Sequence, residues 1–173
     1  MDLRSGGGPV SATNVFKTRS REETIALGRQ IAPLIMPCTG QSIMLILRGD
    51  LGAGKTTLVK GIAAALGVAE PDDVTSPTFT LIHEYEGPET EDGSNIRLFH
   101  LDLYRLETER ELLALGLEEL QSAGALVLVE WGEKFPSLLA HADGEIVISI
   151  DRDDARTVVL ELTPSPDGKV ERV

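Results

Sequence analysis

The sequence contains a single cysteine, Cys38, and no long apolar stretch. One cysteine excludes a disulfide within the chain and is typical of a reducing compartment, in which Cys38 serves as a small hydrophobic residue. No segment reaches the roughly 18 apolar residues that a membrane-spanning helix needs. The first ten residues, MDLRSGGGPV, lack the apolar core of a secretory signal. These absences predict a cytoplasmic protein that does not bind membranes.

Positive charge is also scarce. The chain has 16 Lys and Arg against 28 Asp and Glu, which gives a formal net charge of −12. Nucleic-acid affinity comes largely from Lys and Arg side chains that neutralise phosphates. Tight direct binding to RNA or DNA is therefore not expected, and any connection to RNA is expected to run through a more basic partner.

The 173 residues suit one compact α/β domain. Residues 1–17, with SGGG and few apolar anchors, are predicted to be a flexible tail, and residues 18–173 a single domain. Within that domain, apolar stretches typical of buried strands alternate with helical patterns. We therefore predict a three-layer fold with a mainly parallel central sheet, ending in an edge hairpin formed by the segment EIVISIDRDDARTVVLEL.

Periodicity and capping signals place the other elements. Residues 20–35 begin with an S-x-x-E capping box and predict a helix. Residues 56–66 predict a second helix that ends at Gly67. Residues 107–120 predict a third, amphipathic helix, and a strand is expected to start near Phe79.

A phosphate-binding motif follows the first strongly apolar strand. Gly49–Thr56 reads GDLGAGKT and matches G-x-x-x-x-G-K-[ST], with a buried strand before it and a helix after it. Its glycines allow backbone N–H groups to converge on an anion, and the helix N-terminus adds partial positive charge. Lys55 is expected to reach the β- and γ-phosphates and Thr56 to ligate magnesium. The fold prediction is accordingly a P-loop NTPase.

Two acidic residues end apolar strands, at the sheet edge where ligands of open α/β sheets bind. Asp102 follows IRLFHL, and Glu130 follows ALVLV in the manner of a Walker-B acid. Phosphoryl transfer needs an acid that holds magnesium and a group that orients the attacking oxygen. The alternative for each residue is an acid that caps a loop.

The segment TSPTF, residues 75–79, provides hydroxyl groups from Ser76 and Thr78. These hydroxyls are suited to contact the γ-phosphate or a magnesium-bound water and to order the loop with nucleotide state. A proline-stiffened turn with local hydrogen bonds is the alternative.

Several other side chains have two interpretations each. Trp131, the only tryptophan, is either a packing residue or an aromatic wall beside the nucleotide. Arg105 and Arg156 either neutralise phosphate charge or form surface ion pairs. His100 either takes part in chemistry or is a hydrogen-bonded core residue.

Four segments in this order resemble the bacterial TsaE (YjeE) family, the ATPase of tRNA threonylcarbamoyladenosine biosynthesis: LRGDLGAGKTTLVKGIAAALG, VTSPTFTLIHEYEG, FHLDLYRL and LVLVEWGEK. The match spans about Ser20 to Leu162. The S-P-T-[FY] loop and the H-x-D-x-Y-R block are more specific than the P-loop itself.

The resemblance implies a P-loop ATPase that binds ATP and Mg²⁺ and hydrolyses ATP slowly on its own. It implies association with the TsaD and TsaB subunits, which transfer a threonylcarbamoyl group to adenosine 37 of certain tRNAs, so that tRNA is met only indirectly. Asp102 matches the aspartate of H-x-D-x-Y-R, and Glu130 and Trp131 match the E-W pair of the family. The implied catalytic residues are Lys55, Asp102 and Glu130, and the implied magnesium ligands are Thr56, Asp102 and Glu130. From the motifs and the resemblance together, the predicted nucleotide-binding residues are Asp50, Leu51, Gly52, Ala53, Gly54, Lys55, Thr56, Thr57, Ser76, Thr78, Trp131 and Arg156.

Two other P-loop classes fit the sequence less well. A small-molecule kinase usually carries an Arg-bearing lid, whereas the arginines of this chain are scattered. A GTPase normally reads guanine with an N-K-x-D loop, and the sequence contains none.

Overall fold

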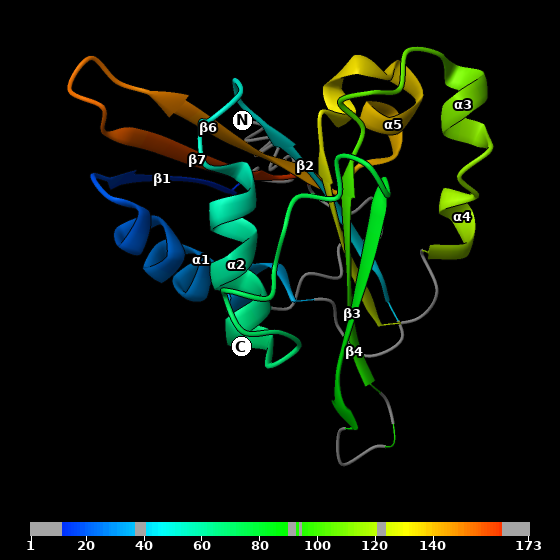
Figure 1. Cartoon of the computed structure of the whole chain (residues 1–173), viewed down its shortest axis with the longest axis horizontal. Helices are drawn as coiled ribbons and strands as arrows, with labels where there is room; N and C mark the ends of the chain where they lie inside the picture. Colours follow the sequence, from blue (N-terminus) through cyan, green and yellow to red (C-terminus); the bar gives the residue numbers. More distant parts are fainter. Residues whose placement is uncertain (1–11, 37–40, 90–92, 94, 121–123, 164–173) are drawn as a thin grey trace, which may run out of the picture.

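The computed structural model describes residues 12–36, 41–89, 93, 95–120 and 124–163, and its central feature is a seven-stranded mixed sheet (Figure 1). Strands β6, β2, β5 and β4 run parallel to one another, whereas β3 pairs antiparallel with β4. At the other side, β7 pairs antiparallel with both β6 and β1. In spatial order the strands are β1 (Ala12–Thr18), β7 (Arg156–Leu162), β6 (Gly144–Ile150), β2 (Ile43–Arg48), β5 (Ala125–Glu130), β4 (Asn95–Asp102) and β3 (Ile82–Glu89).

Helices cover both faces of the sheet, which confirms the predicted three-layer architecture. Successive side chains of a strand point to opposite faces. Leu45 and Leu47 of β2 therefore pack into the cluster beneath α1 and α2, and Met44 and Ile46 pack into the cluster beneath α5. The helices are α1 (Arg21–Ile35), α2 (Lys55–Leu66), α3 (Glu109–Leu113), α4 (Leu117–Leu120), the 3-10 helix η1 (Gly132–Lys134) and α5 (Pro136–His141).

Strand β1 corrects the predicted flexible tail over residues 1–17. It pairs with β7 over its whole length, from Ala12 opposite Leu162 to Thr18 opposite Arg156. Phe16 packs against the cluster beneath α1 and α2. An antiparallel edge strand buries only one face, so no continuous apolar run marks it in the sequence. The predicted C-terminal hairpin forms from β6 and β7, and β1 extends the sheet one strand beyond it.

The remainder of the predicted tail, residues 1–11, lies outside the described residues, as does Cys38. A single domain over residues 18–173 stays a prediction, but a boundary after residue 17 would cut through β1.

The third predicted helix is wrong as a continuous element. Residues 107–120 form two short helices, α3 and α4, because the chain turns at Gly116, where φ is 63°. A left-handed backbone of this kind ends a helix and favours glycine. The helix α3 is held by a capping box between Thr108 and Glu111.

The strand expected near Phe79 begins three residues later, at Ile82. The segment before it makes a turn in which Leu81 has a φ of 68° and donates its N–H to the carbonyl of Pro77 at 2.6 Å. The first two helix predictions are confirmed, with Ser20 capping α1 and a left-handed Gly67 ending α2. Within the described ranges, no helix has the length and apolarity needed to cross a membrane.

Helices α1 and α2 approach each other through two glycines. A Cβ atom at Gly61 would lie 2.0 Å from the carbonyl oxygen of Ile25, and one at Gly28 would lie 2.4 Å from that of Leu58. No side chain larger than hydrogen fits at either position without separating the helices. This contact fixes α2, and with it the P-loop that precedes α2, against the rest of the layer.

We expect Gly61→Ala to lower the free energy of unfolding by about 1–3 kcal/mol, because the added methyl group overpacks the interface. Helix propensity alone predicts the opposite sign, a gain of about 1 kcal/mol. Urea denaturation measures the difference, with Ala65→Gly on the exposed side of α2 as the propensity control. A more stable Gly61→Ala protein would contradict the close helix contact.

Candidate functional site

The P-loop connects β2 to α2 at the carboxyl end of the parallel strands. Gly52 and Gly54 have φ angles of 79° and 110°, a region that side-chain-bearing residues rarely adopt. The loop closes with a hydrogen bond from the N–H of Ala53 to the carbonyl of Asp50 at 3.1 Å. Helix α2 begins at Lys55, so its free N–H groups and dipole face the loop. This is the backbone geometry of an anion cradle.

Lys55 lies within this loop and is 5% exposed. Its Nζ donates to the carbonyl oxygens of Gly49 at 2.6 Å and Asp50 at 3.1 Å. The same ammonium lies 4.1 Å from the ring centroid of Trp131. The ring face adds a favourable cation–π contact. Trp131 therefore lies beside the lysine of the cradle, and its contact with a nucleotide stays a prediction.

Glu130 receives hydrogen bonds from two sides. Thr56 Oγ1 donates to Glu130 Oε1 at 2.7 Å, and His100 Nε2 lies 2.8 Å from the same oxygen. A carboxylate oxygen accepts, so the imidazole hydrogen is on Nε2. His100 is fully buried and its Nδ1 has no partner among the described residues. The histidine is thus a buried, hydrogen-bonded residue beside the acid, as its core interpretation has it, and a part in chemistry stays a prediction.

This pair also fits magnesium. Mg²⁺ is usually held by one or two carboxylates with hydroxyl, water and phosphate oxygens rather than by an all-protein cage. Thr56 and Glu130 supply one hydroxyl and one carboxylate that already touch. In the described part of the chain, no group of three His, Cys, Asp or Glu side chains is arranged to hold a metal ion. The donors present therefore match a metal that depends on a nucleotide for its remaining ligands.

Asp102 binds the loop that follows α2. Its Oδ2 accepts from Ser76 Oγ at 2.6 Å and from Thr78 Oγ1 at 2.8 Å, and the two hydroxyls are themselves 2.8 Å apart. Its Oδ1 accepts from the N–H of Tyr104 at 3.0 Å. Asp102 is 3% exposed and lies directly beside Glu130 in the β4–β5 pairing. The structure therefore joins the two predicted acids and the two predicted hydroxyls at one place.

The segment leading to Ser76 is also fastened to α2. Lys60 Nζ donates to the carbonyl oxygens of Pro71, at 2.7 Å, and Val74. Burial lowers the pKa of Lys60, the Arg21 charge lowers it further, and Asp72 partly opposes both. The Lys60 ammonium exchanges contacts with water for hydrogen bonds to these carbonyls. It therefore anchors the segment before Ser76 to α2.

These residues enclose a cavity of about 350 Å³. Its lining comprises Leu51, Gly52, Gly54, Lys55, Thr56, Thr57, Ser76, Thr78, Asp102, Tyr104, Glu130 and Trp131. Of the other predicted binding residues, Asp50 contributes its carbonyl to Lys55, and Ala53 is buried beneath the loop. Arg156 does not line the cavity, and its guanidinium donates to the carbonyl of Asp154 at its own turn.

Tyr104 is the lining residue that sequence reasoning did not select. Its ring centroid lies 5.2 Å from that of Trp131, with the ring planes tilted by 57°. The tyrosine of the H-x-D-x-Y-R block was the available signal. Arg105, the next residue, stacks on Phe79 at 4.1 Å rather than lining the cavity.

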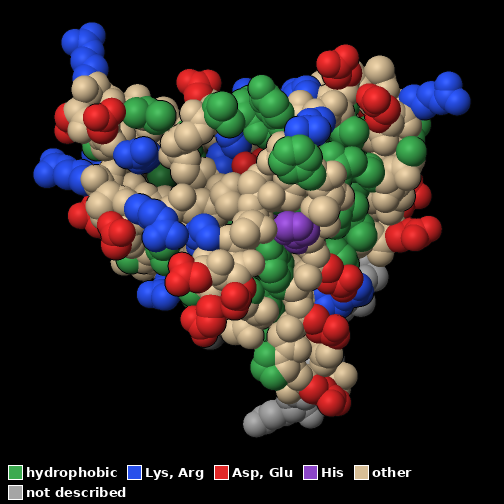
Figure 2. Space-filling model, viewed as in Figure 1, with side chains coloured by type: hydrophobic (Ala, Val, Ile, Leu, Met, Phe, Trp, Pro, Cys, Tyr) green, Lys and Arg blue, Asp and Glu red, His purple; other side chains and the backbone are tan. Residues whose placement is uncertain are grey.

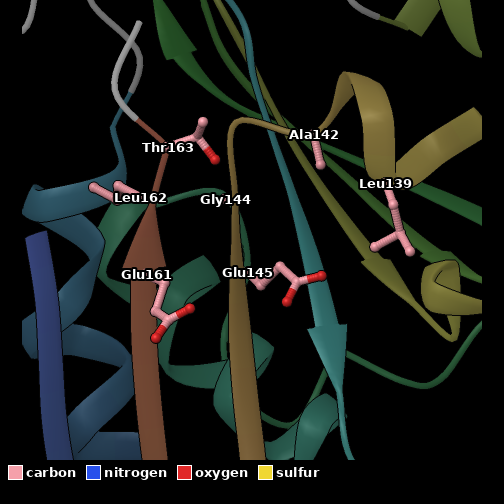
Figure 3. A pocket seen from close by; sticks show the side chains of 7 residues that line it. All are labelled: Leu139, Ala142, Gly144, Glu145, Glu161, Leu162 and Thr163. Atoms are coloured by element: carbon pink, nitrogen blue, oxygen red, sulfur yellow. The ribbon is translucent and has the colours of Figure 1, made fainter. Parts of the chain in front are cut away.

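A second cavity of about 410 Å³ opens at the other end of β6 and β7 (Figure 3). Its polar side chains include Glu145 and Glu161, which are directly opposite each other in the β6–β7 register. Glu145 pairs with Arg48 at 3.1 Å. Two acids without a cradle or a third ligand give this cavity no comparable chemistry.

We expect Asp102→Asn to loosen the loop at residues 76–81, because hydrogen bonds to a charged acceptor contribute roughly 1.5–3 kcal/mol each and the amide weakens two of them. Hydrogen exchange followed by mass spectrometry should show faster exchange in this loop. Asp73→Asn, an exposed acid in the same segment, is the control. Equal exchange in Asp102→Asn and wild type would contradict the described role of Asp102.

Comparison with known proteins agrees with this geometry. The family model described as "Threonylcarbamoyl adenosine biosynthesis protein TsaE" matches residues 18–158. Proteins named tRNA threonylcarbamoyladenosine biosynthesis protein TsaE are similar over most of the chain. That of Haemophilus influenzae is 37% identical over 79% of this chain and 81% of its own, and that of Bacillus subtilis is 40% identical over 83% and 82%. That of a Nostoc species is 45% identical over 72% and 70%.

Among solved structures, YdiB of Bacillus subtilis superposes with a TM-score of 0.64 at 32% identity, covering 90% of this chain and 88% of its own. The range of the family model includes the P-loop, the loop at residues 75–79 and both acids. The chain belongs to the TsaE family.

Proposed function

We propose that this chain is the ATP-binding and ATP-hydrolysing subunit required for threonylcarbamoyl modification of adenosine 37 in tRNAs. In this proposal it acts with the TsaD–TsaB complex and drives or resets the cycle of that complex. The observation that carries the proposal is the single cavity in which the cradle residues Lys55 and Thr56 meet Asp102 and Glu130. The names of the relatives supply the pathway.

The cradle accounts for the binding of ATP. The P-loop and the start of α2 line the cavity in which phosphates would lie, and Lys55 supplies the positive charge. Bound ATP supplies the phosphoanhydride bond whose hydrolysis releases energy. The protein orients this bond and compensates its charge, which is the main contribution that proteins make to phosphoryl transfer.

The two acids have different partners, and this supports a division of labour. Glu130 touches Thr56 and is therefore assigned, with Thr56, to magnesium. Asp102 has both carboxylate oxygens engaged by Ser76, Thr78 and the Tyr104 N–H. Asp102 is accordingly assigned to magnesium only through water, and directly to the loop that would respond to the γ-phosphate.

The surface charge supports an indirect contact with tRNA. Figure 2 shows Lys and Arg side chains interleaved with Asp and Glu on the face viewed, rather than a continuous basic surface. With a net charge of −12, the chain as a whole repels a phosphate backbone. A small-molecule kinase is less well supported, because no arginine is among the described residues that line the cavity.

Replacing Lys55 with alanine should weaken ATP binding by about 2 kcal/mol or more, since a charge that is largely removed from water would no longer meet the phosphates. Isothermal titration calorimetry measures the affinity, with Lys17→Ala in β1 as the matched control. Wild-type affinity in Lys55→Ala would remove the cradle assignment.

The same variant tests the proposed pathway. The wild-type chain, reconstituted with TsaD, TsaB and an unmodified tRNA, should support repeated rounds of threonylcarbamoyl transfer, and Lys55→Ala should not. Modified nucleoside is measured by mass spectrometry. Full multiple-turnover modification without this chain, or with the variant, would refute the proposed function.

Glu130→Ala should leave ATP binding largely intact and slow hydrolysis by roughly a hundredfold, as expected when a group acting on water or magnesium is lost. Single-turnover hydrolysis separates this step from binding. Glu161→Gln, an exposed acid on β7, is the control. Unchanged turnover in Glu130→Ala would return Glu130 to a purely structural role.

A further inference from the structure

Lys134, at the end of η1, directs its ammonium at one short segment of backbone. Its Nζ donates to the carbonyl oxygens of Leu103 at 3.4 Å, Tyr104 at 2.8 Å and Leu106 at 2.5 Å. Three carbonyls of one loop converge on a single charge, and the 3.1 Å hydrogen bond from the Leu106 N–H to Leu103 closes the same turn. Carbonyl groups turned towards one another repel unless a donor lies between them. Lys134 supplies that donor.

The turn that Lys134 holds carries groups of the candidate site. The Tyr104 N–H binds Asp102, and the Tyr104 ring packs against Trp131. The next residue, Arg105, stacks on Phe79 of the loop at residues 75–79. The conformation of this one turn therefore sets the place of an acid, an aromatic ring and a neighbouring loop together.

Lys134 reaches this turn from the other acid-bearing strand. Glu130 ends β5, Trp131 follows it, and the N–H of Lys134 lies 3.4 Å from the carbonyl of Trp131. A second link between the strand ends is the 3.0 Å bond from the Leu103 N–H to the Glu130 carbonyl. The ammonium thus bridges the ends of β4 and β5, where the two acids lie.

The charge of Lys134 also attracts the carboxylate of Glu111 at the start of α3. The pKa of Glu111 is lowered first by the N–H of Glu107, then by the hydroxyl and N–H of Thr108, while desolvation opposes them and Lys134 adds an attraction. The contribution of Lys134 to this shift is the smallest, so its main contacts are those with the carbonyls of residues 103–106.

We propose that Lys134 is a positioning residue of the ATPase site: it holds Tyr104 against Trp131 and the Tyr104 N–H on Asp102, so that the catalytic side of the cavity is fixed before the nucleotide binds. This inference rests on the proposed function. It assigns to Lys134 no contact with the nucleotide, because Lys134 is not among the residues that line the cavity.

Loss of the ammonium should affect catalysis more than binding. The cradle, with Lys55 and Thr56, belongs to the P-loop and α2, whereas the Lys134 ammonium binds carbonyls of the turn after β4. Without Lys134, we expect the three carbonyl groups to move apart and to bind water. The turn would then no longer hold Tyr104 in place. Misplacement of a positioning group by about 1 Å can reduce a rate by roughly a hundredfold.

The test compares Lys134→Met, Lys134→Arg and Lys134→Gln with wild type, and Lys17→Met, an exposed lysine of β1, is the matched control. The first readout is the emission of Trp131, the only tryptophan, in the free protein. The second is ATP hydrolysis, separated into Kd for ATP and single-turnover rate, and the third is the melting temperature.

We expect Lys134→Met to shift the Trp131 emission and to lower the rate about tenfold or more with Kd within about twofold of wild type. Lys134→Arg, which keeps the charge and the donors, should recover most of both readouts, and Lys17→Met should match wild type. If Lys134→Met does not fold, the Arg and Gln variants carry the comparison, with Gln giving the larger emission shift.

Wild-type emission and rate in a folded Lys134→Met or Lys134→Gln protein would overturn the proposal. A melting temperature that falls while both site readouts stay at wild-type values would reduce Lys134 to a structural residue, and failure of Arg to rescue would also overturn it. If the wild-type chain binds no ATP, the proposed function fails, whereas the emission of Trp131 still decides whether Lys134 places Tyr104.

Discussion

The parallel pairing of β2, β5 and β4 is the constraint on which the site depends. It brings the P-loop, Glu130 and Asp102 to the same edge of the sheet, because parallel strands end together. The contact between Thr56 and Glu130 then joins the start of α2 to the end of β5. Thr56 and Glu130, which are 74 positions apart in the chain, become neighbours because β2 and β5 pair in parallel.

Around the site, lysine side chains donate hydrogen bonds to backbone carbonyl groups of the loops. Lys55 holds the P-loop, Lys60 holds the segment after α2, and Lys134 holds the turn after β4. Each ammonium replaces water at two or three carbonyl groups that belong to a loop without regular hydrogen bonds. A chain with only 16 basic residues thus uses three of them to shape the loops around one cavity. This use of lysines is independent of the excess of acidic residues in the chain.

Much of this arrangement was predictable from local sequence patterns. The G-x-x-x-x-G-K-[ST] spacing identified the cradle, and strand-end positions identified Asp102 and Glu130, because both signals lie within a few consecutive residues. Sequence patterns could not show that Arg156 lies outside the cavity lining, because its place depends on how β7 pairs. Tyr104 and the bridging role of Lys134 were missed because they depend on two strand ends meeting in space. The strand β1 was missed because half of its residues are polar. The break at Gly116 was missed because a single glycine lies within a long pattern of helical periodicity.

The pairing of β1 with β7 has a consequence for biosynthesis. Among the described strands, the first one in the chain pairs only with the last one, so the ribosome must complete nearly the whole described chain before β1 and β7 can pair. Contacts so distant along the chain form slowly, because a long loop must be ordered first. During synthesis the inner apolar side of this segment, including Phe16, therefore emerges without its final cover and stays within reach of chaperones until β7 has been made.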